Sequence, residues 1–269
     1  MENYICITVS VNETKQDDLI FKLVAMGAEG FEQETNHIKA YFKQTNFSNE
    51  NVIMELHGFN FQVSTILPTN WNKEWESNFP MIEIDGICEI YASHHTPKFS
   101  QPFSIHIQPQ MSFGTGHHAT TQLMIKLIHQ WNCENKKILD MGAGTGILGI
   151  FALKKNAKSV TFIDIEEWAA QNIKENIALN HLPEQEILCG NHNLIKGNFD
   201  GIFANINKNI LLEHANSYYQ HLIKNGHLFL SGFFDFDENS ILMVYKKLGF
   251  ELINRMEENG WIALEWQKL

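Results

Sequence analysis

Cysteine is scarce in this sequence, and the few cysteines are not grouped. Cys6, Cys88, Cys133 and Cys189 lie far apart, and no pair forms a C-x-x-C motif. Structural zinc sites commonly draw on such pairs, so the sequence predicts none, and we expect no bound metal. Scattered free thiols are typical of a reducing compartment, which predicts a cytoplasmic protein.

Basic residues are also few. The chain has 20 Lys and Arg against 31 Asp and Glu, which gives a formal net charge of −11. Binding to nucleic acid through phosphate contacts requires clustered positive charge, so we expect no direct nucleic-acid partner. A negative chain suits a basic protein partner, although an acidic surface that serves only solubility explains the charge equally well.

Signals for export and for membrane insertion are missing as well. Met1-Glu2-Asn3 does not place a basic region ahead of an apolar one, so no signal peptide is expected. No apolar run is long enough to cross a membrane. The length of 269 residues and the hydrophobic content of 44% allow one large or two small domains with a substantial core.

The most informative stretch that is present reads I-L-D-M-G-A-G-T-G-I-L-G, at 138–149. Gly142, Gly144 and Gly146 alternate between the end of an expected strand and the start of an expected helix. Glycine lets the backbone turn tightly and lets a ligand approach it closely. The helix N-terminus adds free N–H groups. The alternative is a glycine-rich turn that binds nothing.

Two classes of ligand fit this stretch. Gly144, Gly146 and Gly149 satisfy G-x-G-x-x-G, the dinucleotide fingerprint. Asp164, at the end of the next expected strand, can bind two ribose hydroxyls of either a nicotinamide dinucleotide or S-adenosylmethionine. Asp140 distinguishes the two classes of ligand, because folds that bind dinucleotides usually have an apolar residue at this position. An acid suits a ligand with a cationic end, so the stretch favours S-adenosylmethionine.

A second glycine-containing loop precedes an amphipathic helix. It reads F-G-T-G-H-H-A-T-T, from Phe113 to Thr121, and includes Thr115. Such a loop can fold over a ligand, and Thr121 in the first helical turn can hydrogen-bond it; simple helix capping is the alternative. The adjacent His117 and His118 point to different faces and predict packing rather than metal binding.

Two further strand ends complete the expected site. The third strand of the nucleotide core ends at Cys189-Gly190-Asn191, where an adenine would lie. The fourth, at 199–204, is followed immediately by Asn205. Carboxyl ends of parallel strands share one edge of the sheet, so Asn205 is expected in the crevice. A turn-forming role is its alternative.

The element pattern divides the chain. Expected strands at 4–11, 30–34, 38–43 and 61–67, with helices at 17–26 and after Ser48, give the order β-α-β-β-α-β of a ferredoxin-like module. It contains no catalytic constellation, which favours a binding module over a spacer. Pro68 ends it. We therefore expect a domain at 1–67, a connector at 68–94 and an α/β domain at 95–269.

The element pattern of the expected domain at 95–269 predicts a doubly wound, Rossmann-like α/β sheet. Expected strands of this domain lie at 103–107, 137–139, 159–163, 186–188, 199–204 and 226–231, while an expected strand and turn at 82–92, around Asp85-Gly86, falls in the connector. Expected helices include the amphipathic helix that bears Leu123, Leu127, Ile128 and Trp131, a helix that starts with 147–153, and helices at 166–180 and 238–248. The pattern ends in an antiparallel hairpin, 251–255 and 261–266, through Asn259-Gly260.

These motifs together resemble the bacterial ribosomal-protein methyltransferases of the PrmA type. The resemblance covers nearly the whole chain. It rests on W-N-K-E-W (71–75), F-G-T-G-H-H-A-T-T (113–121), I-L-D-M-G-A-G-T-G-I-L (138–148), F-I-D-I (162–165), A-N-I (204–206) and N-G-H-L-F-L-S-G (225–232). The chain departs from the family pattern at 108–112, at 117–119 and at Asn207, which concerns loop geometry and amine preference rather than the cofactor site.

The resemblance implies a class I S-adenosylmethionine-dependent methyltransferase. Its cofactor contacts would fall on Thr121, Gly142, Asp164 and Asn205, and the small N-terminal domain would recognise the substrate. In that family the substrate is the eleventh protein of the large ribosomal subunit, which is methylated on amino groups of lysine side chains or of the N-terminus.

The implied chemistry needs no enzyme nucleophile. A neutral amine must be held in line with the S–CH₃ bond, and positioning supplies much of the rate. Asn205 can accept a hydrogen bond from the amine and is the candidate catalytic residue. No dedicated general base stands out, so loss of the amine proton to water is expected. The alternatives are methylation of another protein or of a small molecule, a nicotinamide-dependent oxidoreductase, and a non-catalytic binding protein.

Overall fold

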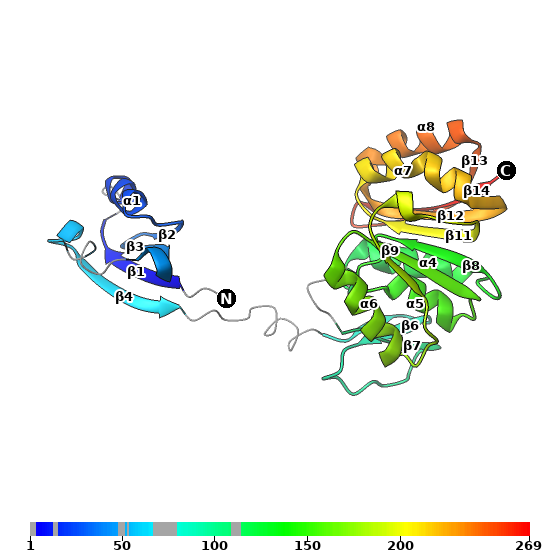
Figure 1. The fold of residues 1–269 in the computed structure, drawn as a ribbon, viewed down its shortest axis with the longest axis horizontal. Coiled ribbons are helices and arrows are strands. Elements are labelled where there is room, and N and C mark those ends of the chain that lie inside the picture. Colours follow the sequence, from blue (N-terminus) through cyan, green and yellow to red (C-terminus); the bar gives the residue numbers. More distant parts are fainter. Residues whose placement is uncertain (1–3, 13–15, 48–51, 53, 67–79, 109–113) are drawn as a thin grey trace. The chain divides into compact units, whose positions relative to one another are not determined.

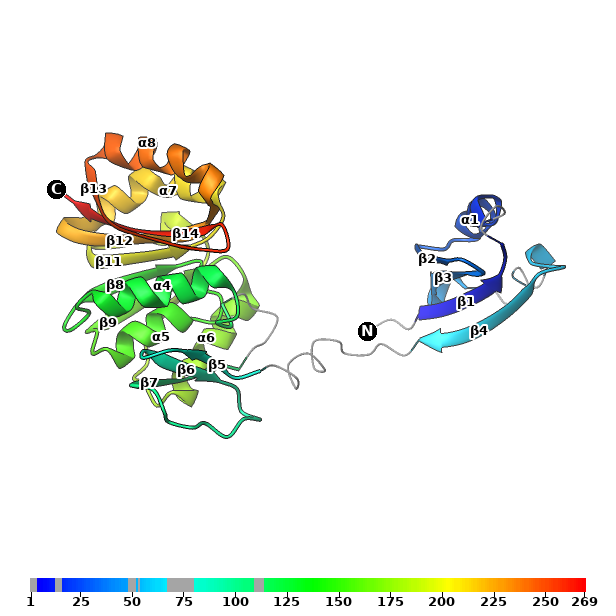
Figure 2. The same cartoon turned by 180° about the vertical axis from the view of Figure 1, so that it is seen from behind.

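The chain forms two compact units, 1–71 and 72–269, which we describe separately. The computed structural model describes residues 4–12, 16–47, 52, 54–66, 80–108 and 114–269. The W-N-K-E-W motif at 71–75 lies outside these residues. Figure 1 shows the elements of each unit and Figure 2 shows them from behind.

The N-terminal unit is built on a four-stranded antiparallel sheet in the order β2-β3-β1-β4. Its elements are β1 (Tyr4–Ser10), α1 (Gln16–Ala25), β2 (Gly30–Glu34), β3 (His37–Lys43), a short 3-10 helix (Gln44–Asn46) and β4 (Asn60–Ile66). Ile5, Ile7 and Val9 of β1 share a core with Leu19 and Leu23 of α1. The four predicted strands are present. The helix expected after Ser48 falls partly outside the described residues, so the ferredoxin-like interpretation stays a prediction.

The larger unit contains a seven-stranded sheet in the order β10-β9-β8-β11-β12-β14-β13. The first five of these strands pair in parallel, and β14 is antiparallel to both neighbours. The strands are β8 (Lys137–Met141), β9 (Ser159–Asp164), β10 (Glu186–Cys189), β11 (Phe199–Asn205), β12 (Leu222–Phe234), β13 (Phe250–Glu258) and β14 (Trp261–Lys268). The prediction of a Rossmann-like sheet with a C-terminal antiparallel hairpin is confirmed.

Helices cover both faces of this sheet (Figures 1 and 2). One layer holds α4 (Ala119–Gln130), α5 (Ile147–Lys154) and α6 (Glu167–Leu179), and the other holds α7 (Lys208–His221) and α8 (Glu238–Leu248). Short 3-10 helices occupy His192–Leu194 and Asp235–Asp237. Alternate strand residues enter the two cores: in β8, Ile138 packs with the first layer and Leu139 with the second.

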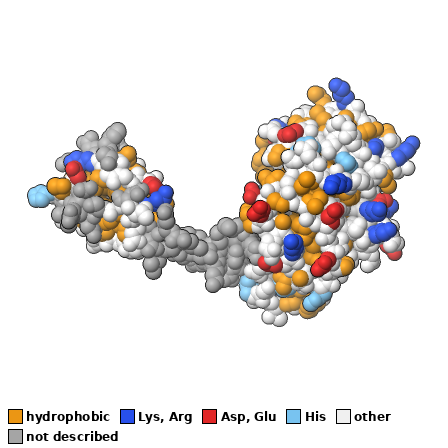
Figure 3. All heavy atoms as spheres, in the orientation of Figure 1, with side chains coloured by type: hydrophobic (Ala, Val, Ile, Leu, Met, Phe, Trp, Pro, Cys, Tyr) orange, Lys and Arg blue, Asp and Glu red, His pale blue; other side chains and the backbone are white. Residues whose placement is uncertain are grey.

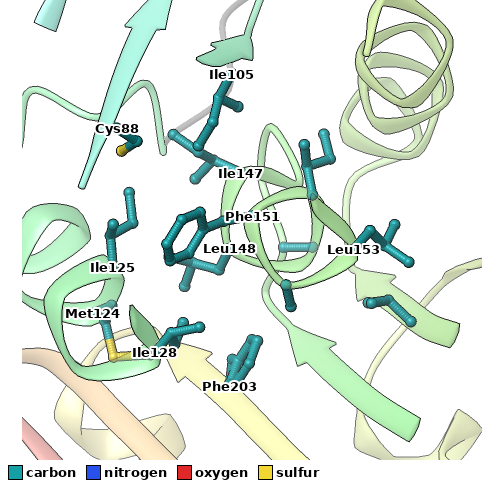
Figure 4. Close-up of a cluster of buried hydrophobic side chains, with 14 of the residues drawn as sticks. Cys88, Ile105, Met124, Ile125, Ile128, Ile147, Leu148, Phe151, Leu153 and Phe203 are labelled. Atoms are coloured by element: carbon teal, nitrogen blue, oxygen red, sulfur yellow. The ribbon is translucent and has the colours of Figure 1, made fainter. Parts of the chain in front are cut away.

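A second, three-stranded sheet packs on the first helical layer. It consists of β5 (Ile82–Ile84), β6 (Cys88–Tyr91) and β7 (Phe103–His106), in the order β5-β6-β7. Figure 4 shows Cys88 and Ile105 close to the side chains of Ile147 and Phe151 of α5. Because α5 lies between two sheets, Ile147 to Leu153 are all buried, as expected for a helix that is apolar all round.

This packing corrects the expected domain boundaries. Residues 82–91 form strands whose apolar side chains are buried against α4 and α5, so they belong to the larger unit and not to a connector at 68–94. Residues 67–79 lie outside the described part of the chain. A second difference is α7, which the sequence reading did not include.

Candidate active site

A cavity of about 630 Å³ opens at the carboxyl edge of the large sheet. Its walls include Gly142 and Gly144 after β8, Asp164 at the end of β9, Asn191 after β10 and Asn205 at the end of β11. Residues from four neighbouring strand ends, three of them with polar side chains, therefore converge at one place, where ligands of open α/β sheets bind. The volume suits one ligand of cofactor size.

Gly142, in the loop after β8, and Gly232, in β12, both lie against Ile206. Gly142 has φ +68°, and a Cβ there would lie 2.3 Å from Cγ2 of Ile206. The backbone of Ile206 is also close to Gly232, since a Cβ on Gly232 would lie 2.3 Å from the Ile206 carbonyl oxygen. Ile206 is thus packed against two glycine backbones, which positions the preceding Asn205. The absence of a side chain at Gly142 is therefore needed for this packing, in addition to any close approach of a ligand.

Asp164 fastens the glycine loop. Its side chain is 9% exposed, with Oδ2 accepting the backbone N–H of Gly144 at 2.8 Å and Oδ1 accepting that of Glu166 at 3.1 Å. Each carboxylate oxygen can accept more than one hydrogen bond, so the carboxylate can still bind ribose hydroxyls from its position in the cavity wall.

Asp140 lies behind the loop. It is 1% exposed, is not among the residues that line the cavity, and accepts the N–H of Gly149 in α5 at 2.9 Å. Burial, opposed by this hydrogen bond and assisted by nearby Asp164, raises the pKa of Asp140 to about 7. Asp140 therefore supports the N-terminus of α5. Its expected contact with a cationic ligand stays a prediction.

Three buried polar atoms at or beside this cavity lack partners among the described residues; one is Nδ1 of His192, a lining residue. The other two are the hydroxyl of Thr121 and the side-chain oxygen Oδ1 of Asn205. Buried polar atoms are nearly always hydrogen-bonded, so each unpaired atom needs an explanation. Asn205 lines the cavity, so a polar ligand bound there would explain the unpaired Oδ1. Thr121 sits on α4 directly after Thr120, which is itself a lining residue.

The other predicted site residues fall in different places. Phe113 lies outside the described residues. Thr115 does not line the cavity, and its hydroxyl lies 3.4 Å from Nδ1 of His117. His118, a lining residue, is the N-cap of α4 and accepts the N–H of Thr120. Among the residues that the structure describes, no group of three His, Cys, Asp or Glu side chains is placed to hold a metal.

Asn176 of α6 and Asn180, the C-cap of that helix, hold the chain that leads to the F-G-T-G loop. Asn176 accepts the N–H of Gln108 at 2.9 Å and donates to the Thr145 carbonyl at 2.9 Å. Asn180 accepts the N–H of His106 at 3.0 Å and donates to its carbonyl. The Thr145 hydroxyl in turn donates to the Gly114 carbonyl. The two loops of the site are thus joined through α6.

Sequence reasoning missed much of the cavity wall. The lining residues it did not single out include Ile165, Trp168, His192, Ile206, Ile210, Glu213, His214, Gly232 and Trp261. Three of them belong to α7, whose signals were Asn207 as N-cap and the apolar spacing of Leu211, Ala215 and Tyr218. Trp261 follows the predicted Asn-Gly turn, but only the sheet order brings this hairpin beside β12.

The sequence is similar to that of proteins named ribosomal protein L11 methyltransferase. The sequence model of the family described as "Ribosomal protein L11 methyltransferase (PrmA)" matches residues 1–269. A ribosomal protein L11 methyltransferase of Phocaeicola vulgatus is 37% identical over 266 residues, covering 95% of this chain and 94% of the relative. That of Porphyromonas gingivalis is 39% identical over 264 residues, covering 94% and 91%.

A solved structure agrees with these relatives. The crystal structure of a ribosomal protein L11 methylase from Lactobacillus delbrueckii subsp. bulgaricus matches with a TM-score of 0.65 and 28% sequence identity, covering 71% of this chain and 99% of that one. The full-length family match and relatives above 30% identity over nearly the whole chain agree with the motifs and with the geometry of the cavity. This chain therefore belongs to the ribosomal protein L11 methyltransferase (PrmA) family.

Proposed function

We propose that this protein transfers methyl groups from S-adenosylmethionine to amino groups of ribosomal protein L11. The observation that carries the proposal is the unpaired Oδ1 of Asn205, which lies in the wall of the same cavity as Asp164 and the glycine loop. Family membership supports the methyl donor and the class of substrate. The protein would act in the cytoplasm; no described helix is long and apolar enough to cross a membrane.

The residues of the cavity suit S-adenosylmethionine, which supplies an electrophilic methyl group when bound. Asp164 would accept the ribose hydroxyls, the backbone of Gly142 and Gly144 would lie against the ligand, and Asn191 would be close to the adenine. Thr121 would satisfy its free hydroxyl there. We also propose that Phe113 and Thr115 contact S-adenosylmethionine.

Asn205 would orient the amine. Its Oδ1 accepts an N–H of the incoming amine, which aims the nitrogen lone pair away from the asparagine. An ammonium has no lone pair, and a lysine amine with a pKa near ~10.4 must first lose a proton. A nearby positive sulfonium favours that loss, and water takes the proton. Asn205 is held in place because Ile206 is packed against Gly142 and Gly232.

The N-terminal unit would supply substrate recognition. The sheet of residues 4–66 brings no lining residue to the described cavity. A protein substrate needs more contact area than one amine provides, and a separate module can provide it. The expected domain at 1–67 is therefore proposed as the recognition domain for ribosomal protein L11.

Mass spectrometry of ribosomal proteins tests the function. Cells with and without the gene for this chain should differ in the mass of ribosomal protein L11 by whole methyl groups, placed on lysine or N-terminal amines. An unchanged mass would contradict the proposal. Thermal stabilisation by S-adenosylhomocysteine but not by NAD(H) separates the methyltransferase from the nicotinamide alternative.

A further inference from the structure

A continuous row of aromatic rings leads from the cavity to the surface. His118 and Trp261, both in the cavity wall, meet edge to face with ring centroids 4.7 Å apart. Trp261 stacks on Phe234 at 3.8 Å, and Phe234 stacks on Phe236 at 5.2 Å. Phe236 is 76% exposed. We call Trp261, Phe234 and Phe236 the aromatic ledge.

The ledge is fixed in place by its backbone. Phe234 and Trp261 face each other across the β12–β14 pair. The N–H of Asp235 donates to the Gly260 carbonyl at 2.9 Å, and Asp237 forms an ion pair with Lys208 at the start of α7. The exposed ring is therefore held before any partner arrives, which reduces the entropy cost of binding.

Exposure of this kind is not explained by folding. The outer ring of Phe236 leaves apolar area in water, while the ring beneath it is already stacked. Fixed exposed aromatics rimmed by polar groups are typical of interaction sites. Asp235, next to Phe236, is exposed and has no ion pair with a described residue. Acidic and basic side chains are otherwise interspersed on the face of this unit seen in Figure 3.

We propose that the aromatic ledge binds the basic polypeptide segment that flanks the amine to be methylated. This inference rests on the proposed function. When a substrate amine enters the cavity, the polypeptide that carries it must lie at the opening of the cavity. Trp261 belongs both to the cavity wall and to the ledge. Lysine or arginine stems pack on the rings, their cationic ends interact with the ring faces, and Asp235 attracts them further. The net charge of −11 fits a basic partner.

The kinetics of full-length Phe236→Ala test this docking surface. We expect KM for intact ribosomal protein L11 to rise about tenfold, the loss typical of an aromatic anchor. The turnover number and the affinity for S-adenosylhomocysteine should stay within about twofold, because Phe236 does not line the cavity. Phe236→Tyr should restore a KM close to that of the wild type.

One control variant and one further probe make the result specific. Met243→Ala changes an apolar residue that is 73% exposed on α8 and is not part of the ledge, and it should leave KM unchanged. Asp235→Asn keeps the acceptor for the N–H of Phe236 but removes the charge. It should raise KM about twofold to threefold at low salt and have no effect at high salt.

Three outcomes overturn the inference. A KM for Phe236→Ala within twofold of the wild type shows that the ledge does not bind substrate. An equal rise for Met243→Ala shows a general surface effect. If wild-type protein does not methylate ribosomal protein L11 at all, the proposed function fails and the ledge assignment fails with it, a result that the variants cannot mimic.

Discussion

The carboxylate of Asp164 already accepts two backbone hydrogen bonds in the structure, from Gly144 and from Glu166. Asp164→Ala should therefore weaken S-adenosylhomocysteine binding in two ways, by removing the ribose acceptor and by releasing the glycine loop. Hydrogen bonds to charged groups contribute about 1.5–3 kcal/mol, so we expect a loss of at least tenfold in calorimetry. Asp164→Asn, which keeps the shape and one acceptor, should lose less. Unchanged affinity in a folded alanine variant would reject the assignment.

Gly142→Val is a poorer probe of the same site. The valine side chain would collide with Ile206, and the positive φ of Gly142 is unfavourable for any branched residue. Lost binding in that variant would combine damage to the loop with loss of ligand contact. The sequence predicted Gly142 as a binding residue, but only the structure gives its packing role, because Ile206 is distant in the chain.

Asp140 makes folding stability depend on pH. Its pKa rises from 3.8 to about 7 in the folded protein, so the folded state binds the proton more tightly than the unfolded state. The resulting stability is full below pH about 4 and is lost as the pH rises through about 7. Asp140→Asn keeps an acceptor for the Gly149 N–H and does not titrate.

Urea unfolding of both proteins checks this prediction. The wild type should lose on the order of 3 kcal/mol relative to Asp140→Asn between pH 5 and pH 8. If the unfolding free energies of the two proteins change in parallel with pH, Asp140 is not the titrating group.

At the scale of elements, α6 joins the two loops of the site through Asn176 and Asn180. Asn176→Leu should leave the half-buried Gln108 N–H and the buried Thr145 carbonyl without these partners. Each unsatisfied group costs about 1–3 kcal/mol, so the midpoint of urea unfolding should fall clearly. Gln171→Leu changes an exposed amide of the same helix and should have little effect. Equal midpoints for the two variants would show that this helix–loop connection adds nothing.

Most elements of the larger unit could be predicted because the sequence patterns that specify them span only a few neighbouring residues. The alternation in 159–163, the glycine loop before α5 and the Asn259-Gly260 turn all act within a few residues. The turn residues have φ of 53° and 78°, as a two-residue hairpin requires. The helix α7 was missed because its apolar positions alternate with Asn and His. The assignment of 82–91 to a connector was wrong because only the packing against α5 reveals where these strands belong.

Part of the candidate site could also be predicted from local sequence patterns. Gly142, Gly144, Asp164 and Asn205 each follow a predicted strand, and parallel strands place their carboxyl ends together, so these residues meet in one cavity. Trp261 and His214 could not be placed this way. Their positions depend on the order of the strands and on which helix covers which face, and both are set by long-range packing.

At the scale of the whole molecule, the two units predict separable tasks. A protein beginning at Thr69 contains the larger unit and every described lining residue of the cavity. It should bind S-adenosylhomocysteine with the affinity of the full chain but should methylate intact ribosomal protein L11 at least tenfold more slowly at low substrate. Full activity of the folded truncation would favour a spacer role for residues 1–67.

Single-turnover transfer by Asn205→Ala tests the central claim most directly, namely that the cavity presents an amine to S-adenosylmethionine through the unpaired Oδ1 of Asn205. Binding of cofactor and transfer of a labelled methyl group to ribosomal protein L11 should be measured on the same samples. With saturating cofactor, we expect the rate of transfer to fall by about a hundredfold, while cofactor affinity falls much less. Normal transfer at saturation, with only weaker cofactor binding, would contradict the claim.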